Sequence, residues 1–250
     1  MGIIFISSLN TQNNIVIVIF SGESMATSGV NIDISIEHGQ LKSFGLTHFQ
    51  YQQGDHIGLV LAFSSLIPIF LIVVETTIVL SRREIIGITF LLGQLLNEAF
   101  NLALKLAIRE SRPNPHLGDG YGMPSSHSQF MGFFAVYVCM YLQNRVTTDT
   151  VQKLAVQIGA LALSALTVIS RVYLGYHTVL QVFAGTAVGL AAGYAWYQLI
   201  ELVVYPSGIV SYALDSSVCK WLLIRDSRDI KDIVQAEYEL TRAARNKRTE

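Results

Sequence analysis

The sequence predicts an all-α, polytopic membrane protein in which about five to six membrane helices form a bundle. Of its 250 residues, 51% are hydrophobic and only 14% are charged, and the mean hydropathy is +0.44. Soluble domains carry about 25% charged residues. The deficit arises from long apolar runs, which are therefore predicted to cross a bilayer. The net charge of −1 gives no reason to expect a nucleic acid partner.

Five apolar runs follow a mixed, more polar N-terminal segment. They cover about residues 58–80, 85–107, 130–142, 154–170 and 179–204. The third run is short for a span unless Ser126, His127 and Ser128 begin its helix, because spanning takes about 20 residues. A weaker stretch, 209–224, is predicted to be a tilted or re-entrant sixth segment or an interfacial helix. The expected organisation is a luminal or peripheral arm (1–54), a membrane domain (55–224) and a polar cytosolic tail (225–250).

Basic residues at the ends of the runs predict the orientation, because cytosolic loops are enriched in lysine and arginine. With one crossing per run, one side of the membrane receives Arg82, Arg83, Arg145, Lys153, Arg225, Arg228 and Lys231. The opposite side receives Lys105, Arg109, Arg112, His127, Arg171 and His177. Basic groups on the outer side need another reason, and we expect them to bind an anion.

Two segments on that outer side suit phosphate binding. Lys105 and Arg112 are seven positions apart, two helical turns, so a continuous helix would place them on one face before Pro113 ends it. The Lys105 ammonium group would supply a point charge, and the planar Arg112 guanidinium would donate paired N–H groups to phosphate oxygens. Ser125 and Ser126 open the next helix, where free backbone N–H groups and hydroxyls form an anion site. Basic residues at a helix end are also typical interfacial anchors.

A third segment, Ser170 to His177, brings Arg171 and a second histidine to the same surface. The convergence of cations and histidines is harder to explain by anchoring, since charged groups at membrane depth are expensive. Together they provide fixed positive charge, a nucleophile and a proton donor for phosphoryl transfer. Glu110 and Asp119 are the only nearby carboxylates and do not suit a magnesium site. A reaction without metal or cofactor is expected.

The order and spacing of these residues resemble the type 2 phosphatidic acid phosphatase superfamily, with its K-x6-R-P, P-S-G-H and S-R-x5-H-x3-D motifs on a six-helix membrane bundle. Ser126 stands where the family has glycine. The resemblance implies that His177 is the nucleophile and forms a phosphohistidine, while His127 protonates the leaving group and later activates water. It also implies a phosphate-binding set: Lys105, Arg112, Ser125 and Arg171, with Ser126 donating a backbone N–H.

Gln181 replaces the aspartate that closes the third motif. In the family, that carboxylate orients the nucleophilic histidine and stabilises its positive form. Glutamine brings no charge, so we expect a weaker nucleophile. Because a phosphoanhydride has a better leaving group than a phosphomonoester, we expect a preference for pyrophosphate over monophosphate lipids. Asp119 is a candidate for the missing carboxylate. Asn101 shares a helical face with Asn97 and Lys105, either to support the site or to bond between helices.

Residues 94–98, 121–131 and 170–177 resemble the dolichyl pyrophosphate phosphatases of the endoplasmic reticulum, and the likeness runs from about 46 to 247. It implies hydrolysis of dolichyl pyrophosphate, a polyisoprenyl pyrophosphate held in the lipid bilayer, to dolichyl phosphate and phosphate. The reaction would take place at the luminal face and recycle the lipid carrier for protein N-glycosylation. The alternatives are a broader phosphatase of phosphatidate or sphingoid phosphate, an inactive lipid-phosphate binder, and a small transporter, for which Glu98 is the sole support.

Overall fold

The computed structural model describes residues 5–6, 17–18, 41–44, 49–117, 120–146, 149–230 and 233–246, and divides the chain into two units, Met1–His38 and Gly39–Glu250. In the first unit, β1 (Phe5–Ile6) pairs with β2 (Ile17–Val18) in antiparallel fashion. The second unit begins with an antiparallel hairpin of β3 (Leu41–Phe44) and β4 (Phe49–Gln52). The luminal or peripheral position of the arm stays a prediction.

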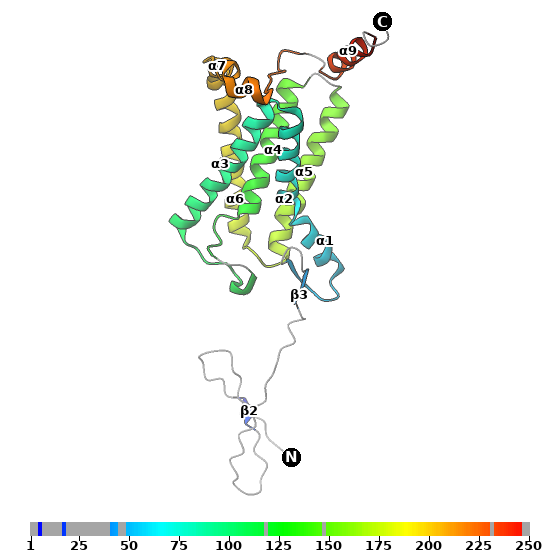
Figure 1. Cartoon of the computed structure of the whole chain (residues 1–250). Helices are drawn as coiled ribbons and strands as arrows, with labels where there is room; N and C mark the ends of the chain where they lie inside the picture. Colours follow the sequence, from blue (N-terminus) through cyan, green and yellow to red (C-terminus); the bar gives the residue numbers. More distant parts are fainter. Residues whose placement is uncertain are drawn as a thin grey trace. The chain divides into compact units, whose positions relative to one another are not determined.

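Helices make up the rest of the second unit (Figure 1). The bundle contains α1 (His56–Ser64), α2 (Ile67–Arg82), α3 (Ile85–Ile108), α4 (Ser126–Arg145), α5 (Thr150–Tyr173) and α6 (Val179–Leu199), which continues as the π-helical η2 (Ile200–Val204). The remaining helices are the 3₁₀ helix η1 (Pro115–Leu117), α7 (Ile209–Asp215), α8 (Ser217–Leu222) and α9 (Ile233–Asn246). The predicted all-α membrane bundle is confirmed.

Within the described residues, four helical segments are long and apolar enough to cross a membrane: His56–Arg82, Ile85–Ile108, Thr150–Tyr173 and Val179–Val204. The more polar α4 has 20 residues, begins at Ser126 as the third run required, and packs against α3, α5 and α6. With α4 the described part of the bundle has five long helical segments, of which four are apolar enough to span; about five to six membrane helices were predicted. The stretch 209–224 forms two helices of 7 and 6 residues. At 1.5 Å per residue each extends only about 10 Å, so neither spans.

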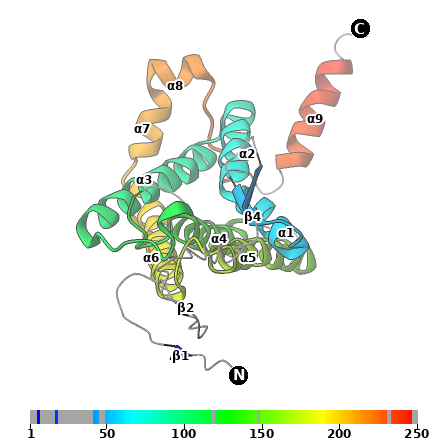
Figure 2. The same ribbon diagram turned by 90° about the horizontal axis from the view of Figure 1, so that it is seen from below.

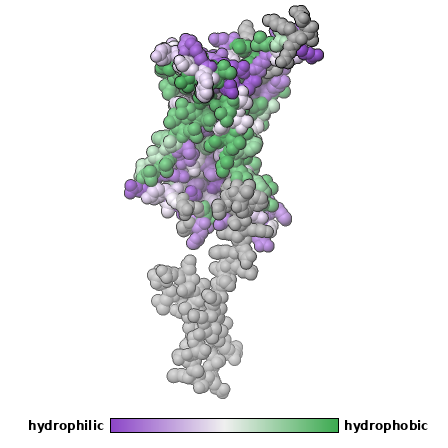
Figure 3. Space-filling view, viewed as in Figure 1, coloured by the Kyte–Doolittle hydropathy of each residue, from purple (hydrophilic) through white to green (hydrophobic). Residues whose placement is uncertain are grey.

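Helices α5 and α3 bury mainly polar side chains and expose apolar ones. The buried positions of α5 are Ala160, Ser164, Thr167, Ser170 and Arg171, whereas Leu154, Ile158, Leu161 and Ile169 on the same helix are exposed. The buried face of α3 is similarly polar, with Thr89, Gln94, Asn97 and Asn101. Hydrophobic side chains accordingly gather over the middle of the helices, with hydrophilic ones towards both ends (Figure 3). This distribution fits a lipid environment, where polar groups must find partners between helices.

Helix α6 lies against α4 with very little space between the backbones, and Figure 2 shows the two adjacent. A Cβ at Gly185 would lie 2.5 Å from the carbonyl oxygen of Ser125, and one at Gly189 would collide with that of Gln129. Glycine permits this approach because it has no side chain. The approach brings the start of α4 next to the first turn of α6, where the candidate site lies.

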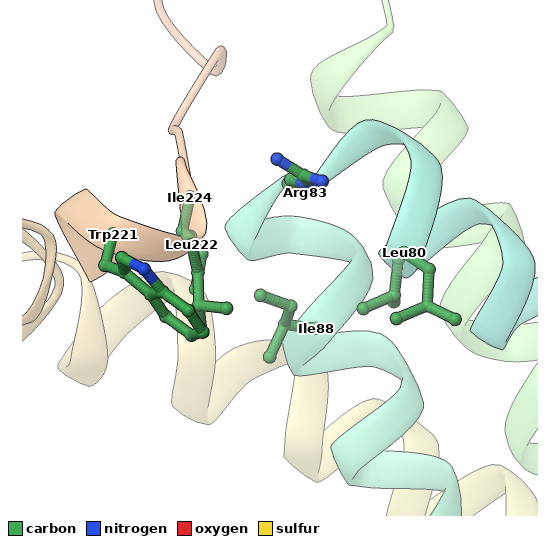
Figure 4. Close-up of a pocket in the computed structure, with 7 residues that line it drawn as sticks. Leu80, Arg83, Ile88, Trp221, Leu222 and Ile224 are labelled. Atoms are coloured by element: carbon green, nitrogen blue, oxygen red, sulfur yellow. The ribbon is translucent and has the colours of Figure 1, made fainter. Parts of the chain in front are cut away.

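Arg82 and Arg225, two of the basic residues predicted for the cytosolic side, lie at one end of the bundle, whereas Lys231 lies outside the described residues. Arg225 pairs with Glu84 at 2.9 Å and with Glu237 at 2.8 Å, and Arg82 also pairs with Glu237. At this end a groove of about 500 Å³ opens between α8 and the α2–α3 turn (Figure 4), lined by Val79, Leu80, Arg83, Ile88, Trp221, Leu222 and Ile224. Ile88 and Lys105 are 17 residues apart on α3, about 25 Å, so the groove is remote from the outer-side residues.

Candidate active site

The break between α1 and α2 supplies two backbone carbonyl groups to the interior. Pro68 has no N–H, so it cannot bond the carbonyl oxygen of Ser64 four residues earlier. That oxygen instead accepts from Thr167 Oγ1 on α5 at 3.4 Å. The next carbonyl, of Ser65, lies 3.1 Å from His127 Nε2. The first apolar run, expected to be one helix, is thus interrupted where it meets a predicted catalytic histidine.

Ser65 also holds a buried arginine. Its Oγ accepts from Arg171 Nη1 at 2.9 Å and lies 3.3 Å from Ser170 Oγ. Arg171 is only 4% exposed, and its guanidinium carbon lies 4.0 Å from the centre of the Tyr176 ring. Its Nε has no hydrogen-bond partner among the described residues. A fixed cation with an unused N–H is suited to an anionic ligand.

His177 lies in the turn between α5 and α6. Gly175, with φ of +75°, allows the chain to reverse, and the His177 backbone N–H donates to the Arg171 carbonyl oxygen at 3.1 Å. The side chain is 3% exposed, and Nδ1 lies 3.2 Å from Gln181 Oε1. Burial first, and then the charges of Arg112 and Arg171, lower the pKa of His177 to about 3. The imidazole is therefore neutral near pH 7.

Gln181 is placed by the start of α6. Thr178 is the N-cap and Gln181 is the third helical residue, and the two form a capping box in which each side chain meets the other's backbone. Gln181 is fully buried; its Nε2 donates to Glu110 Oε1 at 2.8 Å and to the Ser111 carbonyl oxygen at 2.9 Å. The backbone carbonyl oxygen of Gln181 accepts from the Ser125 N–H at 3.1 Å. The Gln181 side chain thus connects α6 to the loop after α3, and its backbone carbonyl connects α6 to the start of α4.

The start of α4 has the features of an anion site. Ser125 is the N-cap, but its side chain does not cap the helix; its Oγ instead accepts from Ser128 Oγ at 3.1 Å. The N–H groups of the first turn are consequently available to a ligand. Lys105 Nζ donates to Ser126 Oγ at 3.2 Å, so the predicted lysine reaches this helix start.

Hydrogen bonds between α3 and α4 keep these two helices in register. Asn101 Nδ2 donates to Gln129 Oε1 at 2.8 Å, and Gln129 Nε2 donates to Asn97 Oδ1 at 2.9 Å. Asn101 Nδ2 also lies 3.4 Å from the Pro124 carbonyl oxygen. These are the interhelical bonds given above as one alternative for Asn101, and they fix Lys105 relative to Ser126.

The structure brings most of the predicted site residues together and adds two that sequence reasoning missed. The half-buried Arg112 lies close enough for its charge to act on His177, while Asp119 lies outside the described residues. Ser65 was missed because its role depends on a backbone carbonyl; Pro68 within an apolar run was the available signal. Glu110 was noted without a role, and no spacing linked it to Gln181. No group of three His, Cys, Asp or Glu in the described ranges could hold a metal ion.

A multi-pass helical membrane protein with a cationic, histidine-containing anion site is the class that this fold and site define. Comparison with known proteins identifies the family within this class. The profile of the PAP2 superfamily matches residues 86–204. The chain belongs to the PAP2 superfamily. The relatives described next are named as lipid phosphatases.

Relatives cover most of the chain. Dolichyldiphosphatase 1 of Homo sapiens is 40% identical, over 81% of this chain and 89% of its own length. Lipid phosphate phosphatase gamma of Arabidopsis thaliana is 37% identical, over 82% of this chain and 93% of its own. Among solved structures, the transmembrane PAP2-type phosphatidylglycerolphosphate phosphatase of Bacillus subtilis matches with a TM-score of 0.52 and 25% identity, covering 60% of this chain and 79% of that one.

Proposed function

We propose that this protein is a metal-independent lipid pyrophosphate phosphatase that hydrolyses dolichyl pyrophosphate to dolichyl phosphate and phosphate. One observation carries the proposal: a buried, neutral His177 is held through Nδ1 by Gln181, beside the cations of Arg112 and Arg171. The similarity to dolichyldiphosphatase 1 of Homo sapiens, at 40% identity, supports the choice of substrate.

His177 is the nucleophile in this proposal. Its Nδ1 carries the proton that faces Gln181 Oε1 at 3.2 Å, which leaves the lone pair on Nε2. Nε2 attacks the terminal phosphorus of the pyrophosphate, the bond from phosphorus to the bridging oxygen breaks, and dolichyl phosphate leaves. Water then attacks the phosphohistidine, phosphate is released, and His177 returns to its starting form.

His127 is the general acid and base. A carbonyl oxygen can only accept, so the contact of His127 Nε2 with the Ser65 carbonyl at 3.1 Å places a proton on Nε2. The other ring nitrogen, Nδ1, takes up a proton from water when the pyrophosphate anion binds, delivers that proton to the leaving oxygen, and later removes one from the attacking water. While Nδ1 carries that proton the ring is cationic, and the Ser65 carbonyl stabilises it.

The phosphate-binding groups surround the position where charge develops. Arg171 is fixed by Ser65, and Lys105 by Ser126. Together with Arg112 and the backbone N–H groups at the start of α4, these groups stabilise the extra negative charge of the transition state. Fixed cations thereby take the role that a metal ion plays in other phosphatases.

We place the reaction at the luminal face of the endoplasmic reticulum membrane. The end of the bundle that contains Arg82, Arg145, Arg225 and Arg228 is assigned to the cytosol by the positive-inside rule. Lys105 and His177 then lie on the luminal side. Dolichyl phosphate released there is recycled as the carrier for protein N-glycosylation.

The test is phosphate release from dolichyl pyrophosphate by the purified protein in detergent with EDTA. We expect turnover by the wild type and none by His177→Asn. His116→Asn provides the matched control, because His116 is exposed in η1. Activity that requires added metal, or that survives in His177→Asn, would overturn the mechanism.

A broader lipid phosphate phosphatase is the second candidate, favoured by the similarity to lipid phosphate phosphatase gamma of Arabidopsis thaliana at 37% identity. A panel of dolichyl pyrophosphate, phosphatidate and sphingoid phosphate separates the two. Similar kcat/KM values for all three would favour this candidate. No turnover of any of them would indicate a lipid-phosphate binder.

A further inference from the structure

The orientation of the Gln181 amide is imposed by its surroundings. Its Nε2 faces two oxygens, Glu110 Oε1 at 2.8 Å and the Ser111 carbonyl at 2.9 Å. Its Oε1 faces the Thr178 N–H at 3.3 Å. Turning the amide over would set an oxygen against two acceptors and an NH₂ group against a donor, so all three contacts would be lost.

This orientation determines which nitrogen of His177 carries the proton. Because Gln181 Oε1 can only accept, the nitrogen 3.2 Å away, Nδ1, is the protonated one. The lone pair is consequently on Nε2. Glu110 is thus connected to His177 by an amide that accepts from the imidazole at one end and donates to a carboxylate at the other.

The loop that contains Glu110 is fitted closely to this amide. The Glu110 carbonyl oxygen accepts from the Gly122 N–H at 2.7 Å. A Cβ at Gly122 would lie 2.8 Å from both amide heteroatoms of Gln181. Gln181 is fully buried and Glu110 is half-buried, so the connection is shielded from water at its Gln181 end and partly shielded at its Glu110 end. A carboxylate acts more strongly on a neighbouring charge in such surroundings than in solvent.

We propose that Glu110 is a positioning residue whose negative charge acts on His177 through the Gln181 amide. The inference rests on the proposed function, in which His177 becomes positively charged as its Nε2 bonds to phosphorus. The polarised amide stabilises that charge and holds the tautomer. Glu110 contacts Gln181 and not His177 itself, so its charge is expected to affect the rate less than a carboxylate in direct contact with the histidine would.

The kinetic test uses substitutions that preserve shape. Glu110→Gln retains the hydrogen bond but removes the charge, and we expect kcat to fall about 10- to 100-fold with KM within about twofold, less than the roughly 10⁴-fold loss for a carboxylate that contacts its histidine. Adding Gln181→Asp to Glu110→Gln returns a carboxylate directly to His177 and should raise kcat at least about tenfold. Glu239→Gln, which changes an exposed carboxylate on α9, is the control.

Each result decides the role of Glu110. Wild-type kcat in Glu110→Gln would overturn the inference, as would a loss that Gln181→Asp leaves unrescued, since the contact would then be only structural. Nitrogen-15 chemical shifts of His177 give a readout that needs no turnover and thus separates this inference from the proposed function. We expect the Nδ1–H tautomer in the wild type and more of the Nε2–H tautomer in Glu110→Ala. A wild type dominated by Nε2–H would contradict the inference even in an active enzyme.

Discussion

The imidazole Nε2 of His127 lies 3.1 Å from the backbone carbonyl oxygen of Ser65, which is free because the first membrane segment is broken there. The same residue's hydroxyl accepts from Arg171 at 2.9 Å. The break thus positions the proposed acid with its backbone and a phosphate-binding cation with its side chain. Both groups would shift if the segment were a continuous helix.

Ser65→Ala is expected to weaken substrate binding. It removes the hydroxyl that holds Arg171 but leaves the carbonyl that holds His127. A hydrogen bond to a charged group contributes about 1.5 kcal/mol or more, so KM should rise about tenfold. The control is Ser64→Ala, whose hydroxyl bonds only to the Leu61 carbonyl among the described residues. Equal KM values for the two variants would contradict the role given to Ser65.

Gln181→Asp is expected to broaden the substrate range. The wild type should favour dolichyl pyrophosphate over dolichyl phosphate, because a nucleophile without a direct carboxylate depends on the better leaving group. A carboxylate next to His177 should raise kcat/KM for the monophosphate about tenfold, or about 1.4 kcal/mol of barrier. Parallel assays with both substrates measure the ratio of kcat/KM for dolichyl pyrophosphate to that for dolichyl phosphate. Equal turnover of the two by the wild type would refute the preference.

The pH dependence follows from the lowered pKa of His177. Burial, Arg112 and Arg171 lower it to about 3, so the neutral, attacking form dominates at any higher pH. The acid limb of kcat/KM due to His177 should therefore lie near pH 3. Arg112→Gln removes one cation, so the pKa should rise and the limb move to higher pH. Carbon-13 shifts of the His177 ring check the same value. A limb that stays in place, or moves to lower pH, would disprove this electrostatic account.

Gly189→Ala is expected to separate α4 from α6. The new methyl group would collide with the Gln129 carbonyl oxygen, a backbone atom that cannot rotate away. Overpacking of this kind typically destabilises by about 1–3 kcal/mol, and activity should fall with it because α4 and α6 contribute His127 and Gln181. Gly159→Ala on α5 is the control, since nothing lies within 4 Å of its Cβ. The unfolding midpoint in detergent should fall for the first variant alone.

Sequence reasoning predicted the features that depend on local pattern. The apolar runs located α3, α5 and α6, and the motifs supplied Lys105, Ser126 and His177, because membrane helices and helix-start anion sites follow from local composition. The break at Ser65 and the contact of Glu110 with Gln181 depend on long-range packing between segments far apart in sequence. The stretch 209–224 was ambiguous by hydropathy, and the structure resolves it into α7 and α8.

The most direct test of the central claim is to trap the phosphorylated enzyme. Dolichyl pyrophosphate labelled with phosphorus-32 in its terminal phosphate is mixed with purified protein in EDTA and quenched with alkali within milliseconds. We predict an alkali-stable, acid-labile label on the His177 peptide in the wild type and in His116→Asn, and none in His177→Asn. Phosphate release without any label on His177, or a label on another residue, would contradict the account.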